Sequence, residues 1–174
     1  MQRLFKCPGV IPTFALGFNR PIADTPPGLD TWRGIPGVVG FPNRWQFIDE
    51  ATPNDTDYIS QGLGNAGSIY SVSLGAPVVT VGVTSVTVRV RARSMGGTNP
   101  LNFTFNYDLI RGAFGFSSVG NVLTTNFATL SHTLTPVELA NFLAQVGTIE
   151  VLVHGSGGPG TDAFEVSWIE VEID

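Results

Sequence analysis

The chain has 174 residues, of which 43% are hydrophobic and 13% are charged, with a formal net charge of −5. This length is enough for one domain with a core that needs no metal or disulfide support. The negative charge and the absence of consecutive Lys and Arg residues argue against nucleic acid as a partner, and no stretch of about 20 apolar residues predicts a membrane span. The single cysteine, Cys7, excludes an intrachain disulfide and a cysteine-based zinc site.

Residues 1–40 differ from the rest because prolines recur in them and no strand or helix period is visible. Proline fixes φ and removes a backbone donor, so we expect an extended N-terminal arm. The arm is rich in apolar residues, which predicts that it becomes ordered against its own domain or against a neighbouring subunit. Prolines interrupt the apolar residues too early for a signal peptide, so synthesis in the cytoplasm is expected. The predicted contact residues of the arm are Leu4, Phe5, Phe14, Phe18 and Trp32.

Residues 41–174 have the pattern of one β-domain. Hydrophobic and polar residues alternate over 69–74 and most clearly over 85–93. A Gly-rich turn separates the second segment from 101–109, which alternates again, so the two are predicted to pair as an antiparallel hairpin. The further strands expected are 113–116, 127–134, 148–154 and 163–173.

One helix and one irregularity are also marked. The run Thr135-Pro136-Val137-Glu138 is typical of a capping box with proline at the first helical position, and it predicts a helix over 137–146. In the last strand the apolar positions change phase after Trp168, which predicts a β-bulge or a crossing between sheets. Trp168 itself is expected in the core. Many short strands with a single short helix predict an all-β fold, a β-sandwich of jelly-roll type.

An acidic segment is the candidate metal site. Four acidic residues fall within nine positions around a Thr-Pro-Asn turn, and clustered carboxylates are the oxygen ligands that calcium prefers. Their spacing departs from that of an EF-hand loop, and Asp is also an ordinary turn former. The candidate calcium ligands are Asp49, Glu50, Asp55 and Asp57, and no other cofactor is expected.

A basic ladder lies on one face of a predicted strand, because Arg89, Arg91 and Arg93 occupy alternate positions. These arginines could bind acidic groups on a neighbouring subunit. The alternative is pairing within the same sheet with Asp108, Glu150, Glu165, Glu170 or Glu172. Trp45, at the entrance of the domain, is a further predicted contact residue.

Catalytic signatures are missing. The two histidines, His132 and His154, are predicted as surface residues because no nucleophile elbow or metal-ligand spacing surrounds them. The glycines at 155–160 lack the lysine and following helix of a phosphate-binding loop. Two carboxylates of the acidic segment would be required for glycan hydrolysis, but nothing sets their separation. The sequence therefore predicts a protein that is not an enzyme.

Three motifs, in this order, carry a resemblance to a known family. They are Trp45 to Glu50 with Asp55 to Ile59 after it, Val88 to Arg93, and Val166 to Glu172. Together they resemble a recurring pattern in virion proteins of tailed bacteriophages, over about residues 45–174. The resemblance implies a virion β-sandwich, either a capsid decoration (cement) protein or a tail component, and it brings no catalytic residues.

Two functions stay open at this point. The first is capsid decoration: a homo-oligomeric structural protein of the virion that contacts capsid or other virion proteins. The second is a carbohydrate-binding jelly-roll module of a tail fibre or lectin-like protein. The second predicts solvent-exposed aromatic side chains on one face of a sheet.

Overall fold

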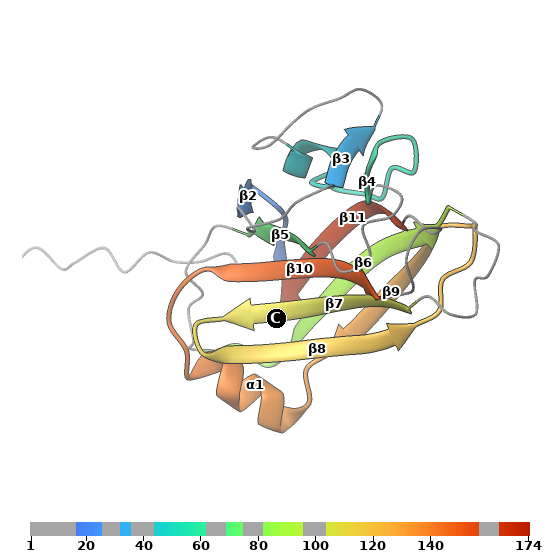
Figure 1. Ribbon diagram of the computed structural model, residues 1–174. Helices are drawn as coiled ribbons and strands as arrows, with labels where there is room; N and C mark the ends of the chain where they lie inside the picture. Colours follow the sequence, from blue (N-terminus) through green and yellow to red (C-terminus); the bar gives the residue numbers. More distant parts are fainter. Residues whose placement is uncertain are drawn as a thin grey trace, which may run out of the picture.

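The computed structural model describes residues 17–25, 32–35, 44–61, 69–74, 82–95, 104–156 and 164–174. They form two antiparallel sheets packed face to face, which we call sheet A and sheet B (Figure 1). Sheet A has the order β3-β4-β11-β6-β9, with β1 also paired to β11, and sheet B has the order β2-β5-β10-β7-β8. The elements are β1 (Gly17–Asn19), β2 (Ala23–Thr25), β3 (Trp32–Ile35), the 3₁₀ helix η1 (Arg44–Phe47), β4 (Tyr58–Gln61), β5 (Ile69–Ser73), β6 (Val86–Ser94), β7 (Thr104–Arg111), β8 (Phe114–Asn121), β9 (Ala128–Thr133), α1 (Pro136–Leu143), β10 (Ile149–Ser156) and β11 (Phe164–Ile173).

The chain passes repeatedly between the two sheets. From β5 to β11 only β7 and β8 are consecutive strands of the same sheet. This is the jelly-roll arrangement, so the predicted all-β sandwich with one short helix is confirmed. The predicted hairpin of β6 with β7 is wrong, because β6 pairs with β11 and β9, and β7 with β10 and β8. Alternation determines which face of a strand is buried, but it does not determine the neighbour.

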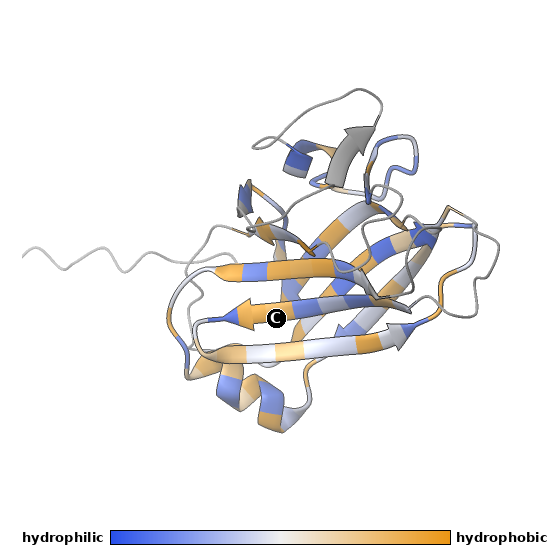
Figure 2. Cartoon of the chain, in the orientation of Figure 1, coloured by the Kyte–Doolittle hydropathy of each residue, from blue (hydrophilic) through white to orange (hydrophobic). Residues whose placement is uncertain are grey.

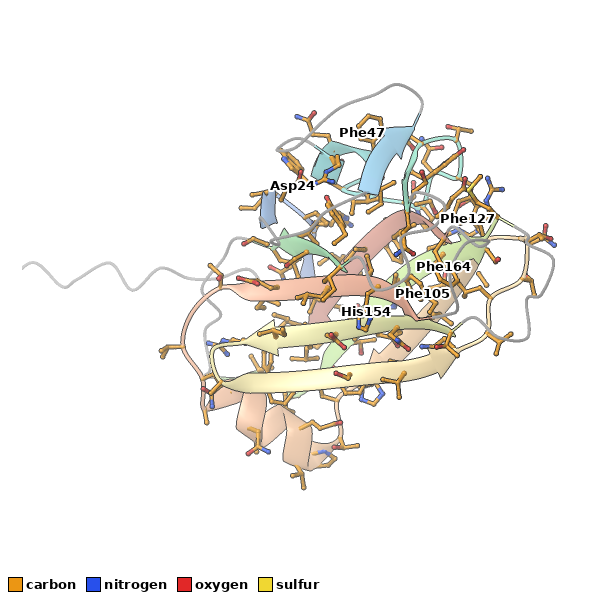
Figure 3. All side chains as sticks on the ribbon, viewed as in Figure 1. Asp24, Phe47, Phe105, Phe127, His154 and Phe164 are labelled. Carbon is orange, nitrogen blue, oxygen red and sulfur yellow. The ribbon has the colours of Figure 1, made fainter. Side chains whose placement is uncertain are left out.

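Each strand buries alternate side chains between the sheets. In β6 the apolar side chains at alternate positions from Val86 to Ala92 are fully buried, and the three arginines face the other way. Figure 2 shows hydrophobic and hydrophilic residues following one another along the strands of both sheets. The rings of Phe105 and Phe164 meet in the core with their centroids 5.5 Å apart (Figure 3).

Three segments of the predicted arm are edge strands of the sandwich. β1 pairs with the C-terminal half of β11, β2 pairs with β5, and β3 pairs with β4. Residues 17–25 and 32–35 therefore lie on the chain's own domain, which is one of the two surfaces open to the arm. The boundary drawn at residue 40 does not separate them from that domain. Strands of three or four residues at sheet edges are what a proline-interrupted chain permits.

The predicted irregularity in the last strand is a β-bulge. The register between β11 and β6 shifts between Val166 and Trp168, which leaves Ser167 as the extra residue. Trp168 is buried, as expected of a core residue, but it does not lie between the two sheets. Trp168 lies opposite Arg91 on the outer side of sheet A, and it is only 6% exposed. Its indole N–H donates a hydrogen bond to the carbonyl of Glu50 at 3.0 Å, so the chain near Glu50 covers it.

Helix α1 begins as predicted and ends earlier, at Leu143. The Thr135 hydroxyl accepts a hydrogen bond from the backbone N–H of Glu138, and the Glu138 carboxylate accepts one from the Thr135 N–H at 2.7 Å. Phe142 is buried, and its ring meets that of Phe114 edge to face, 5.6 Å away. The helix therefore packs beside β8 (Figure 1). In the part of the chain that is described, no helix is long and apolar enough to cross a membrane.

Candidate functional site

The outer side of sheet A carries the arginine ladder and its partners, and we call this surface the charged face. Each of its four arginines has a carboxylate partner. Arg89 reaches Glu170 at 3.2 Å and Glu172 at 2.5 Å. The charged face is defined by Arg20, Arg89, Arg91, Arg93, Asp55, Glu165, Glu170 and Glu172.

Pairing within the sheet therefore accounts for Arg89 and Arg93. Three of the predicted partners are confirmed, since Glu165, Glu170 and Glu172 all contact arginines. The partner roles predicted for Asp108 and Glu150 are wrong, because both residues lie in sheet B. The strands that carry them have the right alternation but belong to the opposite layer.

Asp55 is a partner that alternation could not indicate, because it comes from a loop. Its two carboxylate oxygens accept hydrogen bonds from Nε and Nη2 of Arg91, at 2.7 and 2.6 Å. The hydroxyl of Ser167, the extra residue of the bulge, donates to the same carboxylate at 2.9 Å. The bond with Arg91 is the main cause that lowers the pKa of Asp55. The bulge thus fastens the loop of residues 48–57 to the charged face.

Three aromatic rings flank the charged face. Phe18, on β1 opposite Glu172, is 56% exposed. At the other end, Tyr58 and Phe127 are half-buried with ring centroids 6.0 Å apart. The Arg93 guanidinium lies 4.3 Å from the centroid of Phe127 and 5.5 Å from that of Tyr58, so it stacks on both. Figure 3 shows Phe127 at the same end of the sandwich as Phe164.

The four predicted calcium ligands do not form one metal site. Asp55 is directed at Arg91, whereas Glu50 shares a hydrogen bond with Asp57. Burial, together with this bond and the nearby charges of Asp57 and Asp49, raises the pKa of Glu50 to about 7. No group of three or more His, Cys, Asp or Glu among the described residues could hold a metal. The described residues therefore do not form the expected site, because Asp55 is paired with Arg91 instead.

Glu50 should make the protein less stable as pH rises. Its pKa is about 7 in the folded chain and 4.5 for an unperturbed glutamate, so the folded state holds the proton more tightly. Stability is then fully present below pH 4.5 and is lost as pH rises through about 7. We expect Glu50→Gln to remove most of this loss, which urea denaturation at pH 5 and pH 8 would measure. With Glu150→Gln, a control on sheet B, the wild-type loss should persist; an equal loss in Glu50→Gln would contradict the assignment.

Of the remaining predicted contact residues, only Trp45 has a side chain that the structure describes. Trp45 is half-buried in η1 and packs against the core. Trp32 contributes its backbone to β3, opposite Gln61. Leu4, Phe5 and Phe14 lie outside the described residues.

Sequence reasoning missed a buried ion pair that fastens β2 to the domain. The Asp24 carboxylate accepts hydrogen bonds from the backbone N–H groups of Arg44 and Trp45, at 3.1 and 2.9 Å, and from the Tyr70 hydroxyl. Its Oδ2 also lies 3.4 Å from Nε of Arg44. Asp24 and Arg44 are 8% and 3% exposed. A single aspartate between prolines has no periodicity around it, so no signal in the sequence indicates burial.

The outer side of sheet B is polar, and no Phe, Tyr or Trp faces outward from its described strands. Near its centre, Nε2 of His154 lies 3.4 Å from Oδ2 of Asp108. Burial opposes ionisation of Asp108, but hydrogen bonds with His154 and Ser117 outweigh it and lower the pKa of this carboxyl. The other histidine, His132, stacks on Phe116 at 3.9 Å. Both histidines, predicted at the surface, are half-buried.

No protein-family model and no curated protein matches the chain. Among solved structures, the xylan-binding module CBM15 is 10% identical, with 88% of this chain and 97% of that chain covered and a TM-score of 0.48. A CBM22-1 xylan-binding domain from Paenibacillus barcinonensis is 13% identical over 82% and 85%, with a TM-score of 0.41. A cyclase from Fischerella sp. TAU is 16% identical over 94% and 92%, with a TM-score of 0.48.

At these identities and TM-scores the similarities assign no ligand and no activity to this chain. The virion location, the contacts with capsid proteins, the homo-oligomeric state and the lack of enzymatic activity all stay predictions.

Proposed function

We propose that this chain is a carbohydrate-binding module that takes a neutral glycan along the charged face of sheet A. The observation that carries the proposal is the placement of Phe18, Tyr58 and Phe127 on the outer side of one sheet. The carbohydrate-binding alternative predicts aromatic side chains that reach the solvent on a sheet face; Phe18 is exposed there, and Tyr58 and Phe127 are half-buried. The outer side of sheet B presents no such ring among its described strands.

Rings beside fixed polar groups suit the two kinds of surface on a sugar. The C–H side of a sugar ring packs on an aromatic face, and its hydroxyls need donors and acceptors at set positions. Arg91 and Asp55 hold each other in a two-bond pair, and Arg93 is held by Glu165 and the two rings. These polar groups are thus oriented before a ligand arrives, which lowers the entropy lost on binding.

The charge balance favours a neutral ligand. The charged face has four arginines and four carboxylates in contact with one another. No unpaired charge is left among them to attract an ion, and the whole chain carries a net charge of −5 that repels polyanions. A glycan without uronic acid, sulfate or phosphate groups is therefore the expected class.

The separation of the rings favours a chain of sugars over a single one. Phe18 lies beside Glu172, which pairs with Thr87, whereas Tyr58 and Phe127 lie beside Arg93 at the other end of β6. Six residues of strand separate Thr87 from Arg93, which corresponds to about 20 Å at the usual rise of a strand. A linked glycan can reach both ends, and a monosaccharide cannot.

Affinity electrophoresis against soluble xylan, mixed-linkage β-glucan and galactan, with anionic alginate for comparison, would test the proposal. We expect retardation by at least one neutral polysaccharide. Phe127→Ala and Tyr58→Ala should each weaken it about tenfold, a change of about 1.4 kcal/mol. Val119→Ala, which removes an apolar side chain that is 71% exposed on β8 of sheet B, is the control and should bind as the wild type. Retardation that both ring variants leave unchanged would exclude the charged face as the site.

A further inference from the structure

We propose that the outer side of sheet B holds a second binding site, for a neutral ligand with adjacent hydroxyl groups, centred on Ser71, Asp108 and His154. It lies on the opposite side of the sandwich from the charged face. The inference does not rest on the proposed function, because different residues carry it.

The first observation is the state of Ser71. Tyr70 and Val72, on either side of it in β5, are fully buried in the core, so the Ser71 side chain points to the outer side of sheet B. It is nevertheless only 5% exposed, and its Oγ has no hydrogen-bond partner among the described residues. A buried hydroxyl without a partner is unfavourable, and a bound ligand that supplies one removes this cost.

The second observation is the position of Asp108, which lies in β7, two strands away from Ser71. In the sheet register Ser71 lies opposite Leu152, and Leu152 lies opposite Asp108, so the two polar residues flank Leu152. Strands about 4.8 Å apart place the backbones of Ser71 and Asp108 about 10 Å from each other. A ligand the size of one sugar ring or cyclic polyol can therefore contact both.

The chemistry of the pair selects the ligand. The Asp108 carboxylate accepts hydrogen bonds only, and it has sites for more donors than His154 and Ser117 supply. Two adjacent hydroxyls of a ligand can donate to one carboxylate, as the two N–H groups of an arginine do. A phosphate or carboxylate ligand would meet the negative charges of Asp108 and Glu150 and is not expected.

Apolar side chains provide the floor. Leu152 is half-buried between Ser71 and Asp108, and Ile69, two residues before Ser71, is 37% exposed. His154 lies opposite Ile69 and Asn106 in the middle of the sheet (Figure 3). An apolar floor with a few converging polar groups is the usual composition of a small-ligand site. The C–H side of a sugar or cyclic polyol would rest on it.

The experiment is an NMR titration of the ¹⁵N-labelled chain with methyl β-D-glucopyranoside and with myo-inositol. We expect saturable amide shifts in β5, β10 and β7 with at least one of the two. Ser71→Ala should weaken that binding at least fivefold without lowering the melting temperature, because it removes a hydroxyl that has no partner in the described structure. Ser73→Ala, on the same side of the same strand, is the matched control and should bind as the wild type.

Two results would overturn the proposal: no saturable shift with either compound, or equal affinities of Ser71→Ala and the wild type. Titrating Phe127→Ala separates this site from the charged face. Intact shifts in β5, β10 and β7 in that variant support a site of its own, even if no polysaccharide binds the protein. Loss of those shifts in Phe127→Ala would show that sheet B has no independent site.

Discussion

Replacing Asp24 with alanine is expected to lower the free energy of unfolding by about 3–5 kcal/mol, which is typical when one partner of a buried ion pair is removed. The side chains of Asp24 and Arg44 are 0% and 3% exposed. Without the carboxylate, the Arg44 charge stays buried with less compensation. Two backbone N–H groups and the Tyr70 hydroxyl also lose their acceptor.

Urea denaturation of Asp24→Ala, Asp24→Asn and Asp174→Ala would measure this effect. The asparagine variant keeps the shape and one acceptor oxygen, so its loss should lie between those of the wild type and the alanine variant. Asp174 is exposed at the end of β11, and its replacement should change the free energy of unfolding by less than about 0.5 kcal/mol. If Asp24→Ala cost less than about 1 kcal/mol, β2 would not be fastened to the domain as described.

Replacing Gly155 with alanine is expected to lower the free energy of unfolding by about 1–3 kcal/mol, the usual cost of overpacking a core. A methyl group at this position of β10 would overlap the ring of Phe164 and approach Oε1 of Gln61 to 2.9 Å. Both neighbours are buried, and the Phe164 ring is also held against Phe105. The ring therefore has little room to move away.

Gly115→Ala is the matched control, since Gly115 also lies in a strand of sheet B and a methyl group there meets no atom within 4 Å. Its φ is not positive, so alanine fits the backbone and the change should be neutral or slightly stabilising. Thermal unfolding of both variants followed by circular dichroism would compare them. Equal melting temperatures would mean that the Phe164 ring is not confined by Gly155.

The strands that the sequence predicted are those in which alternation is long enough to be seen. β6 and β11 bury one row of apolar side chains each, and the phase change after Trp168 is visible because the strand extends on both sides of it. The strands β1 to β4 have three or four residues, which is too short for a period to appear. Their place is decided by pairing with strands far along the chain, as when Phe18 lies opposite Glu172.

The sequence predicted Phe18 and the three arginines of β6 as contact residues of the candidate site, but it did not predict Tyr58, Phe127 or the arrangement of the site. The arginine ladder follows directly from alternation along β6, whereas the partner Asp55 comes from a loop that only the bulge at Ser167 brings within reach. The acidic segment illustrates the opposite case. Its carboxylates are adjacent in sequence, yet Asp55 forms an ion pair with Arg91, whereas Glu50 lies beside Asp57.

The sequence by itself therefore determined the fold class, the buried side of each long strand and the start of helix α1, because these depend on side-chain periodicity and on local hydrogen bonds of the backbone. Only the tertiary structure decided which strands are neighbours, which carboxylate each arginine contacts, and that Asp24 is buried while the Ser71 hydroxyl has no partner in the described structure. These contacts join residues that are far apart in the chain. They depend on how the two sheets and their loops pack, which no local pattern records.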